Sequence, residues 1–496
     1  MQFFSTRDRN RVVSASQAIA QGLSDEGGLF VPQSFPQVDV QAICGLEYPE
    51  MAAAIVGQYL TDYSQQFLAE AAKATYGEAF GGKAGYLAPV SDSVYSLELW
   101  HGPTCAFKDY ALQLMPKLLV EAKKNLNRTE KTLILVATSG DTGKAALDGY
   151  HDIPGVEIAV FFPTGGTSEI QRLQMATQEG ENVAVYAVRG NFDDAQTGVK
   201  RIFSDEAIRA ELDRRGFFLS SANSINWGRI LPQVVYYISA YCDLVRDHAI
   251  AMGDKVNFCV PTGNFGDILA AYYAKRMGLP VGKLICASNS NNVLTDFINT
   301  GVYNRKRPFH KTISPSMDIL VSSNLERLVF EETDHNAVQV AEWMKELNEK
   351  GEYKIGTELQ NKILKDFFGT WVDEVETRET IGDVYNNYGY VMDPHTAVAY
   401  KAMEKYRLMT GDETYSIVLS TASPFKFNDV VLASIDPDTY EGKALDPFVA
   451  MDDLSRLAKM PIPAGMQELS KLQKRQSDVV DKTRMEAEVK KLLGLE

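Results

Sequence analysis

The sequence predicts an α/β protein built from open, twisted, mostly parallel sheets with helices on both faces. Between residues 131 and 290, short apolar runs rich in β-branched residues alternate with longer helical stretches. Such alternation is typical of parallel strands buried on both faces of a sheet. A chain of 496 residues also exceeds the roughly 250–300 at which a single core stops growing, so it should divide into lobes. The expected strands are Leu133–Ala137, Val156–Phe162, Val183–Val188, Asn257–Val260 and Leu284–Ala287.

The two ends of the chain extend this plan. Residues 1–95 contain helical spacing, as in Met51–Tyr59, and predict a mainly helical N-terminal lobe. Charged helical stretches lie between about 315 and 385, and one more buried strand is expected at Tyr415–Leu419, where the sheet should close. Residues 431–496 are rich in Lys, Glu and Leu and predict a helical C-terminal extension.

The overall charge excludes some classes of partner. The formal net charge is −15, whereas nucleic acids and anionic membranes attract clustered Lys and Arg. No run of about 18 apolar residues is present, so a membrane-spanning helix is not expected. We therefore expect no nucleic acid and no membrane as partners. Any anionic ligand must be bound by local groups.

Cysteine usage and the N-terminus indicate a cytoplasmic protein. The five cysteines are odd in number, far apart and never in a C-x-x-C arrangement. This pattern is typical of a reducing compartment and predicts neither a metal site nor a disulfide framework. The first residues, MQFFSTRDR, lack a basic stretch followed by an apolar stretch of signal-peptide length.

The first segment with chemical character is HGPTCAFKDY, residues 101–110. It places Lys108 among small and aromatic residues, just after a turn built from Gly102 and Pro103. Partial desolvation lowers the pKa of an amine, as a Schiff-base or proton-transferring lysine requires. On this segment alone, an ordinary helix lysine whose ammonium reaches solvent is an equal alternative.

A second segment, LILVATSGDTGKAA over residues 133–146, runs from an apolar strand through a Gly/Ser/Thr loop into an Ala-rich helix. This order can form an anion cradle at the helix N-terminus. It is not a Walker A loop, because Lys144 is followed by Ala145 and position 138 is Thr instead of Gly. Nucleotide hydrolysis is therefore disfavoured.

A third segment, NFCVPTGNFGDILAA over residues 257–271, repeats that architecture with Gly263 and Gly266 on either side of Asn264. Glycines allow close approach of the backbone to an anion, and successive N–H groups can surround a phosphate. A tight turn without a ligand is the alternative for one such loop. Two loops beside a candidate lysine favour a cofactor that carries phosphate, and the absence of G-x-G-x-x-G argues against a dinucleotide.

A fourth segment, IVLSTASPFKF over residues 417–427, places two hydroxyls, those of Ser420 and Thr421, directly after a buried strand. Sheets of this class bind ligands at the carboxyl ends of their strands. A hydroxyl there could face a ring nitrogen. A turn that ends the strand is the alternative, and the segment alone does not choose between them.

In this order and spacing, the four segments resemble the threonine synthase family of fold-type II pyridoxal-phosphate enzymes, which are related to tryptophan synthase β subunits. HGPTCAFKD looks like the cofactor-lysine motif, TSGDTG the substrate-side loop, PTGNFGD the phosphate loop and STASPFKF the ring-nitrogen segment. The Asn-Phe-Gly-Asp form of the third loop is similar to the bacterial and fungal branch. The resemblance covers most of the chain and implies a large cofactor-binding domain, residues 96–115 and 225–430, and a small α/β domain, residues 116–224.

The resemblance implies roles for individual residues in binding pyridoxal 5′-phosphate. Lys108 is implied as the Schiff-base lysine and Thr421 as the partner of the ring nitrogen. A hydroxyl partner, unlike a carboxylate, does not enforce a protonated ring. The implied phosphate cup consists of Gly263, Asn264, Phe265, Gly266 and Asp267. The residues implied to lie against the substrate amino acid are Ser139, Gly140, Asp141 and Thr142.

The resemblance also implies the substrate, O-phospho-L-homoserine, with L-threonine and phosphate as products. Lys108 would carry out most of the proton transfers. Candidates for binding the departing phosphate are Thr104, Asn226, Arg229 and Lys426. No metal is expected, and the protein should be a monomer or a homodimer. Two alternatives remain at this point: a phospho-lyase that releases a keto acid, and a non-catalytic protein that binds a phosphometabolite.

For two histidines, a structural role is favoured over a role as catalytic acid or base. Histidine titrates near neutrality and is a frequent acid or base. His101 lies seven residues before Lys108 and is expected to pack against the cofactor turn. His395, in the sequence Asp-Pro-His-Thr, is expected to fix the start of a helix.

Overall fold

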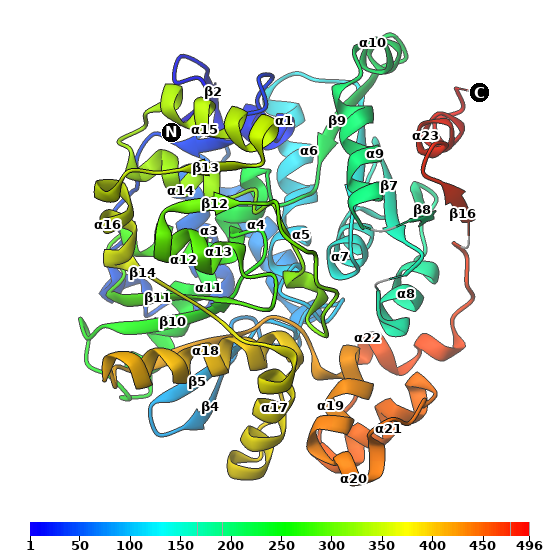
Figure 1. Ribbon diagram of the computed structural model, residues 1–496. Coiled ribbons are helices and arrows are strands. Elements are labelled where there is room, and N and C mark those ends of the chain that lie inside the picture. The colour runs from blue at the N-terminus through cyan, green and yellow to red at the C-terminus, as the bar shows by residue number, and fades with distance from the viewer. Residues whose placement is uncertain (166, 191, 477, 496) are drawn as a thin grey trace.

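The computed structural model describes residues 1–165, 167–190, 192–476 and 478–495, and it confirms the predicted α/β class. Two sheets with helices on both faces lie in two lobes, the smaller on the right in Figure 1. The larger sheet has six strands in the order β14-β11-β10-β15-β5-β4, all parallel except β4. Its strands are β4 (Leu87–Ser91), β5 (Val94–Glu98), β10 (Val256–Pro261), β11 (Val281–Ser288), β14 (Phe367–Trp371) and β15 (Ser416–Ser420).

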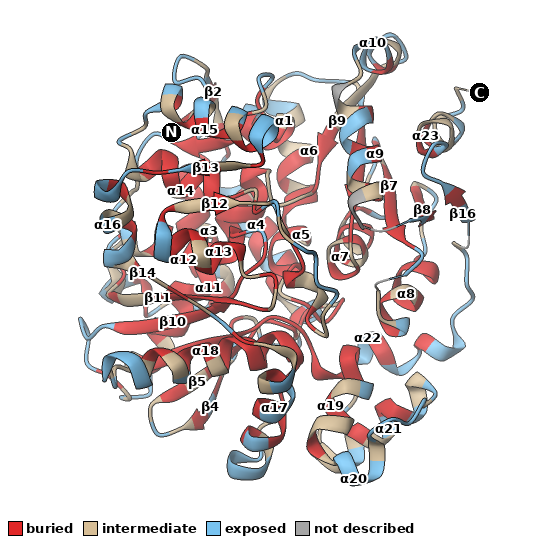
Figure 2. Cartoon of the chain, viewed as in Figure 1, coloured by how far each residue is buried: buried red, intermediate tan, exposed pale blue. Residues whose placement is uncertain are grey.

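The late strand β15 was expected from the sequence to close the sheet. It lies instead in the middle of the large sheet, between β10 and β5. Alternate residues of the central strands face opposite sides. Phe258 and Val260 pack with α11 (Trp227–Arg246), α12 (Gly266–Arg276) and α13 (Val293–Thr300), whereas Cys259 packs with α18 (Pro394–Thr410). The strands are consequently buried on both faces, as their continuous apolar runs require. Figure 2 shows the central strands of the large sheet, such as β10, in the buried colour.

Further helices surround this sheet. They are α5 (Asp109–Leu112), α6 (Met115–Asn125), α14 (Leu325–Glu332), α15 (Ala337–Lys350), α16 (Thr357–Asp366) and α17 (Glu374–Tyr388). A two-stranded antiparallel ribbon pairs β12 (Val302–Asn304), which follows α13, with β13 (Glu352–Lys354), which lies between α15 and α16.

The small sheet has five parallel strands in the order β16-β8-β7-β6-β9. Leu133 and Leu135 of β6 face α9, whereas Ile134 and Val136 belong to the main core on the α7 side. The strands are β6 (Lys131–Ala137), β7 (Val156–Pro163), β8 (Val183–Arg189), β9 (Phe217–Ser221) and β16 (Asp478–Asp481). The helices are α7 (Asp141–Tyr150), α8 (Glu169–Ala176), α9 (Phe192–Ser204) and α10 (Glu206–Arg214).

The N-terminal lobe is helical but also contains a three-stranded antiparallel sheet that the helical spacing did not indicate. The strands are β1 (Gln2–Ser5), β2 (Val12–Ser14) and β3 (Phe30–Pro32), and the helices are α1 (Ala15–Gln21), α2 (Val40–Ile43), α3 (Tyr48–Tyr59) and α4 (Gln65–Tyr76). Ser14 and Gln17 form a capping box at the start of α1. Residues 87–95, assigned to this lobe from the sequence, belong to the large sheet.

The C-terminal segment connects the two lobes. It leaves the large domain through α19 (Asn428–Ile435), α20 (Pro437–Tyr440), α21 (Pro447–Ala458) and α22 (Ala464–Gln467). It then runs up the right-hand side of Figure 1 to β16 and α23 (Met485–Leu492) on the small domain. Val480 and Met485 pack into the core of that domain. The expected helical extension therefore also contributes a strand, β16, to the small sheet.

The expectation of no disulfide is corrected by one pair of cysteines. Cys44, after α2, is bonded to Cys242 of α11, and the Cα atoms lie 4.9 Å apart. The two residues are 198 positions apart in sequence, so spacing alone gave no indication of the pair. The other three cysteines are free and buried. Among the described residues, no helix has both the length and the apolar character needed to cross a membrane.

Candidate active site

A pocket where β10, β15 and β6 end and α7 and α12 begin brings most of the predicted residues together. Its walls include eleven of them: Lys108, Ser139, Asp141, Thr142, Arg229, Gly263, Asn264, Phe265, Gly266, Asp267 and Thr421. Four predicted residues, Thr104, Gly140, Asn226 and Lys426, are not part of its lining. The pocket thus lies at the carboxyl ends of parallel strands, where sheets of this class bind ligands.

The turn that carries Lys108 is attached to the end of β15. The backbone N–H of Phe107 donates to the carbonyl of Thr421 at 2.9 Å, and the N–H of Ser423 donates to the carbonyl of Cys105 at 3.1 Å. An isolated antiparallel bridge joins Ala106 to Ala422. The lysine segment and the hydroxyl segment, far apart in sequence, are therefore held as one unit.

Lys108 is only 9% exposed. Its Nζ lies 4.3 Å from the centre of the Phe107 ring. Burial lowers the pKa of Lys108 to about 8, and Arg229 and Lys426 lower it further, whereas the carboxylate of Asp141 opposes the shift. A larger fraction of this amine is neutral near physiological pH than for an exposed lysine, which suits a nucleophile or base.

The third loop forms an anion cradle at the start of α12. Phe265 adopts a left-handed conformation, φ 63°, and α12 begins at Gly266. The first N–H groups of a helix have no acceptor within it, and they lie at the positive end of the helix dipole. A Cβ at Gly263 would stand 2.7 Å from the carbonyl oxygen of Ser316, so only glycine fits there.

The second loop also ends in a helix N-terminus. Ser139 and Thr142 line the pocket, and Gly140 lies between them with φ 149°. A Cβ at Gly140 would meet the amide of Gln171 at 2.6 Å. Gly140 therefore shapes the loop from behind, while Ser139 and Thr142 present their hydroxyl side chains to the pocket.

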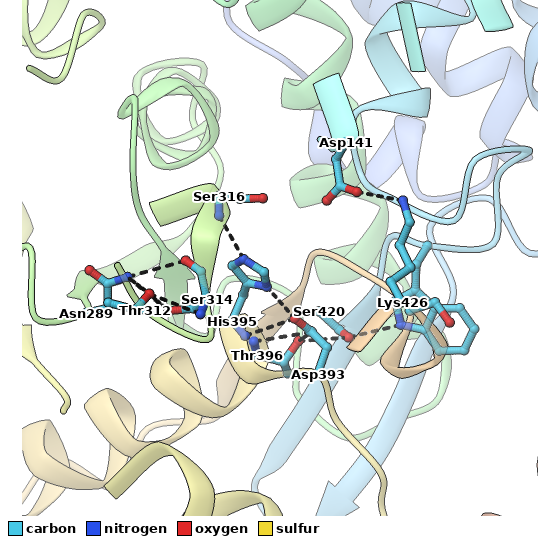
Figure 3. A network of polar contacts seen from close by, with 12 residues as sticks. Asp141, Asn289, Thr312, Ser314, Ser316, Asp393, His395, Thr396, Ser420 and Lys426 are labelled. Atoms are coloured by element: carbon cyan, nitrogen blue, oxygen red, sulfur yellow. Dashed lines mark hydrogen bonds and ion pairs between the residues drawn. The ribbon is translucent and has the colours of Figure 1, made fainter. Parts of the chain in front are cut away.

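Asp141 forms a buried ion pair with Lys426. Nζ of Lys426 lies 2.7 Å from Oδ1 of Asp141 and donates at 2.8 Å to the carbonyl oxygen of Thr104. Figure 3 shows this pair at the right of the network. Burial alone would raise the pKa of Asp141, but the charges of Lys426 and Lys108, with hydrogen bonds from Lys426 and Gln171, hold that pKa far below its usual range. The pair joins the small domain, through Asp141, to the large domain, through Lys426.

Thr104 and Asn226 are committed to structural hydrogen bonds. Oγ1 of Thr104 donates to Asp109 at 2.6 Å. The side chain of Asn226 caps α11 by accepting from the N–H of Gly228 at 2.9 Å, and it donates to the carbonyl of Ile19 at 2.9 Å. Both side chains are fully buried outside the pocket. The structure therefore does not bring them into position to touch a ligand there.

Arg229 is the buried cation of the pocket. It is 2% exposed, and its guanidinium donates to the carbonyl of Ala222 at 2.6 Å, while its Nε has no hydrogen-bond partner among the described residues. No carboxylate of the described chain forms an ion pair with it. Burial lowers the pKa of Arg229 to about 10, so it stays charged at neutral pH. A buried unpaired cation that lines a pocket is suited to an anionic ligand.

His395 lines the pocket as well. Its Nδ1 lies 2.7 Å from Oδ1 of Asp393, and its Nε2 accepts from the backbone N–H of Ser316 at 3.1 Å (Figure 3). Because a backbone N–H can only donate, the proton of this neutral imidazole is on Nδ1. Asp393 also caps α18. His395 thus fixes both the helix start, as expected, and the pocket loop around Ser316. His101 lies 2.7 Å from the carboxylate of Glu98, its ring contacts that of Trp100, and it is not part of the pocket lining.

Several residues of the pocket were not singled out from the sequence. Asn223 and Ser224 come just after the end of β9, so the signal of polar residues after a strand was present there. Residues 315–319 follow no predicted strand and reach the pocket only through the tertiary fold. The full set of unpredicted polar residues is Thr138, Gln196, Asn223, Ser224, Gln233, Thr262, Ser316 and Asp318. No group of three or more metal-binding side chains occurs within the part of the chain that the structure describes.

Comparison with known proteins first defines a class. The family model for pyridoxal-phosphate dependent enzymes matches residues 88–357, which contain the lysine turn, both anion loops and Arg229. The chain therefore belongs to the class of pyridoxal-phosphate-dependent enzymes.

Further comparisons define the family within this class. The models for the threonine synthase N terminus and the threonine synthase C-terminal region match residues 2–76 and 396–492. The crystal structure of pyridoxal-phosphate-bound threonine synthase from Brucella melitensis is similar with a TM-score of 0.86, 34% identity and 99% coverage of both chains. Threonine synthase of Pseudomonas aeruginosa is 38% identical over 87% of this chain and 90% of its own length. The chain belongs to the threonine synthase family.

One similar relative is longer than this chain. Human threonine synthase-like 1 is 41% identical over 87% of this chain, and the match spans 60% of the human protein's length.

Proposed function

We propose that this protein converts O-phospho-L-homoserine into L-threonine and inorganic phosphate with pyridoxal 5′-phosphate as cofactor. One observation carries the proposal. A single pocket contains a buried lysine and two groups suited to phosphate, namely the N-terminus of α12 and the unpaired guanidinium of Arg229. A phosphorylated cofactor and a phosphorylated substrate together need two such groups. Membership of the threonine synthase family supports the same substrate.

The residues of the pocket fit pyridoxal phosphate. The start of α12 offers N–H groups without acceptors, and Gly263 lets the loop before that helix pack closely against the carbonyl oxygen of Ser316. Thr421 offers a hydroxyl for the ring nitrogen and Lys108 an amine for the aldehyde. When bound, the cofactor supplies an electron sink that stabilises negative charge on the carbons of a bound amino acid.

Lys108 is the group that moves protons in this proposal. Its lowered pKa lets the amine accept a proton from the substrate and return it at a later step. Ser139 and Thr142 are placed to hydrogen-bond the substrate from the small domain. Asp141 is paired with Lys426 across the two domains. We propose that this pair keeps the net charge on the small-domain side of the pocket constant and fixes the position of the two domains relative to each other.

The substrate phosphate is proposed to bind Arg229 together with Asn223 and Ser224. All three line the pocket. The amide nitrogen of Asn223 and the hydroxyl of Ser224 can donate hydrogen bonds to the phosphate oxygens. Of the four phosphate candidates from the sequence, only Arg229 is retained. Thr104, Asn226 and Lys426 do not line the pocket, and their polar groups are already bonded to protein groups.

Replacement of Arg229 by Gln is expected to lower kcat/KM for phosphohomoserine by about a hundredfold, because the phosphate loses a buried cation. Steady-state phosphate release measures this. Arg246→Gln, at the exposed end of the same helix, is the matched control and should change kcat/KM by less than about twofold. Cofactor binding, followed by absorbance, should persist in both variants. An unchanged kcat/KM for Arg229→Gln would place the substrate phosphate elsewhere.

Product identification tests the reaction. The purified protein is incubated with pyridoxal phosphate and O-phospho-L-homoserine, and the organic product is identified by mass spectrometry. L-Threonine and phosphate in equal amounts are expected. Formation of 2-oxobutyrate in place of threonine would make the protein a phospho-lyase. A colourless protein that releases no phosphate would make it a binding protein.

We further propose that the protein is cytoplasmic and is a monomer or a homodimer. The acidic composition, net charge −15, supports a protein without nucleic-acid or membrane partners. Light scattering of the purified protein measures the number of subunits.

A further inference from the structure

Asp267 stands out because a carboxyl group lies inside a cradle built for an anion. It is the second residue of α12, lines the pocket and is 7% exposed. A carboxylate at that place would repel a bound phosphate in a region of low dielectric. Either Asp267 turns away fully or it is not charged.

The hydrogen bonds of Asp267 are unequal. Its Oδ1 accepts from the hydroxyl of Tyr237 at 2.6 Å and from the hydroxyl of Tyr236. Its Oδ2 is buried and has no partner among the described residues. Buried polar atoms are nearly always hydrogen-bonded, so this oxygen is expected to have a partner that is not part of the protein.

The supply of donors is too small for a buried carboxylate. The single hydroxyl hydrogen of Tyr236 has two acceptors, Oδ1 of Asp267 and Oε1 of Gln233, the latter at 2.9 Å. The amide nitrogen of Gln233 donates to the carbonyl of Arg229, so Oε1 must face Tyr236. The hydroxyl hydrogen of Tyr237 also has two acceptors, because the backbone carbonyl oxygen of Asp267 lies 3.1 Å from that hydroxyl. Oδ1 of Asp267 therefore receives two hydrogen bonds, each from a donor that has a second acceptor.

We propose that Asp267 is a neutral carboxylic acid in the working enzyme and that it donates a hydrogen bond from Oδ2 to the phosphate held at the start of α12. This inference rests on the proposed function, since that phosphate is taken to be the one of pyridoxal phosphate. The acid would turn a repulsive group into a donor. It would also give the bound phosphate a contact that is made only while the proton is present.

The surrounding charges are consistent with this state. Burial raises the pKa of Asp267 to about 6, while the hydroxyls of Tyr236 and Tyr237 and the charge of Lys108 oppose the rise. Those tyrosines face it from α11, and Lys108 faces it from the turn before α5. Arg229 and Asp318 line the same pocket. A phosphate dianion beside Asp267 raises the pKa further, because it disfavours a second negative charge.

The sign of the pH effect follows from linkage. Binding of the phosphate favours the protonated form, so the acid has a higher pKa with the phosphate than without it. The contribution of Asp267 to affinity is full below its pKa in the free protein, about 6. Above that value, the affinity of the wild-type protein for the phosphate falls by up to about tenfold per pH unit, until the pKa of Asp267 in the complex is reached.

The test compares the wild type with Asp267→Asn, because an amide is the neutral isostere of the acid and keeps a donor at every pH. Protein freed of cofactor is titrated with pyridoxal phosphate between pH 6 and pH 9, and binding is followed by tryptophan fluorescence. The two proteins should bind equally within about threefold at pH 6, and the Asn variant should bind increasingly more tightly as pH rises, by about tenfold or more at pH 9. Because Asp267 also acts on the charge of Lys108, the same titration with pyridoxal, which has the aldehyde but no phosphate, measures the contribution of Lys108 to the ratio.

Two controls sharpen this result. Pyridoxal, which lacks the phosphate, should show the same ratio at all pH values. Tyr237→Phe removes a donor from Oδ1, so the fall in affinity should begin at a higher pH than in the wild type. A ratio for pyridoxal phosphate that stays flat from pH 6 to 9, or weaker binding by the Asn variant at all pH values, overturns the inference while leaving threonine formation by the wild type intact. Failure of the wild type to bind pyridoxal phosphate at all would instead remove the proposed function.

Discussion

Replacement of Lys108 by Ala is expected to lower the rate of threonine formation by about 10⁴-fold. Among the described residues, Lys108 is the only lysine that lines the pocket, so the variant has no amine there. The same change should abolish the absorbance band of the bound cofactor near the visible edge. Phosphate release from phosphohomoserine and the spectrum of the purified variant measure the two effects.

Two comparisons separate chemistry from folding in this variant. Lys124→Ala, on the exposed surface of α6, should retain wild-type activity. Added small primary amines should restore part of the activity of Lys108→Ala, since they can enter the space of the side chain and carry protons. A variant with full activity, or with the wild-type absorbance band, would remove Lys108 from its role.

Replacement of Lys426 by Met is expected to lower the free energy of unfolding by about 3–5 kcal/mol, because it leaves the carboxylate of Asp141 buried without its cation. Denaturant unfolding measures the loss. The pKa of Asp141 is depressed in the wild type, so its stabilising contribution is present above the unfolded pKa and is lost as pH falls. In the variant the penalty should shrink toward acidic pH, because protonated Asp141 no longer carries a buried charge.

The double variant and a less buried ion pair give the controls. Lys426→Met with Asp141→Asn should recover part of the lost stability, since no unpaired charge remains. Lys144→Met removes a partner of the less buried pair with Asp148, 3.2 Å apart, and should cost about 1 kcal/mol or less. Equal losses for Lys426→Met and Lys144→Met would contradict the importance of burial for the first pair.

The elements that the sequence predicted well are those whose signal is local. β6, β7, β8, β10 and β11 each contain the expected run, because continuous β-branched stretches must be buried on both faces. β14 was missed because its residues FFGTW directly follow α16 and lie within the region, about 315 to 385, that was expected to be helical. β16 was missed because three of its four residues are exposed and because it pairs with β8, a strand that is far away in sequence.

The site shows the same division. Lys108 and the two glycine loops could be found from sequence because each is a short segment with a fixed local shape. The use of Asn226 as a helix cap, and of Lys426 as the partner of Asp141, depends on which groups the fold brings near, over 285 positions in the second case. Polarity and spacing do not report such contacts. Asn223 and Ser224, three and two residues before Asn226, reach the pocket instead.

The pairing of β16 with β8 has a consequence for the order in which the protein folds during synthesis. β8 is made long before β16, so its outer edge exposes unpaired N–H and C=O groups to other chains while the rest of the protein emerges. The small domain then completes its sheet only after the whole large domain has been translated. Nascent chains stalled before residue 478 should therefore depend on chaperones more than complete chains do.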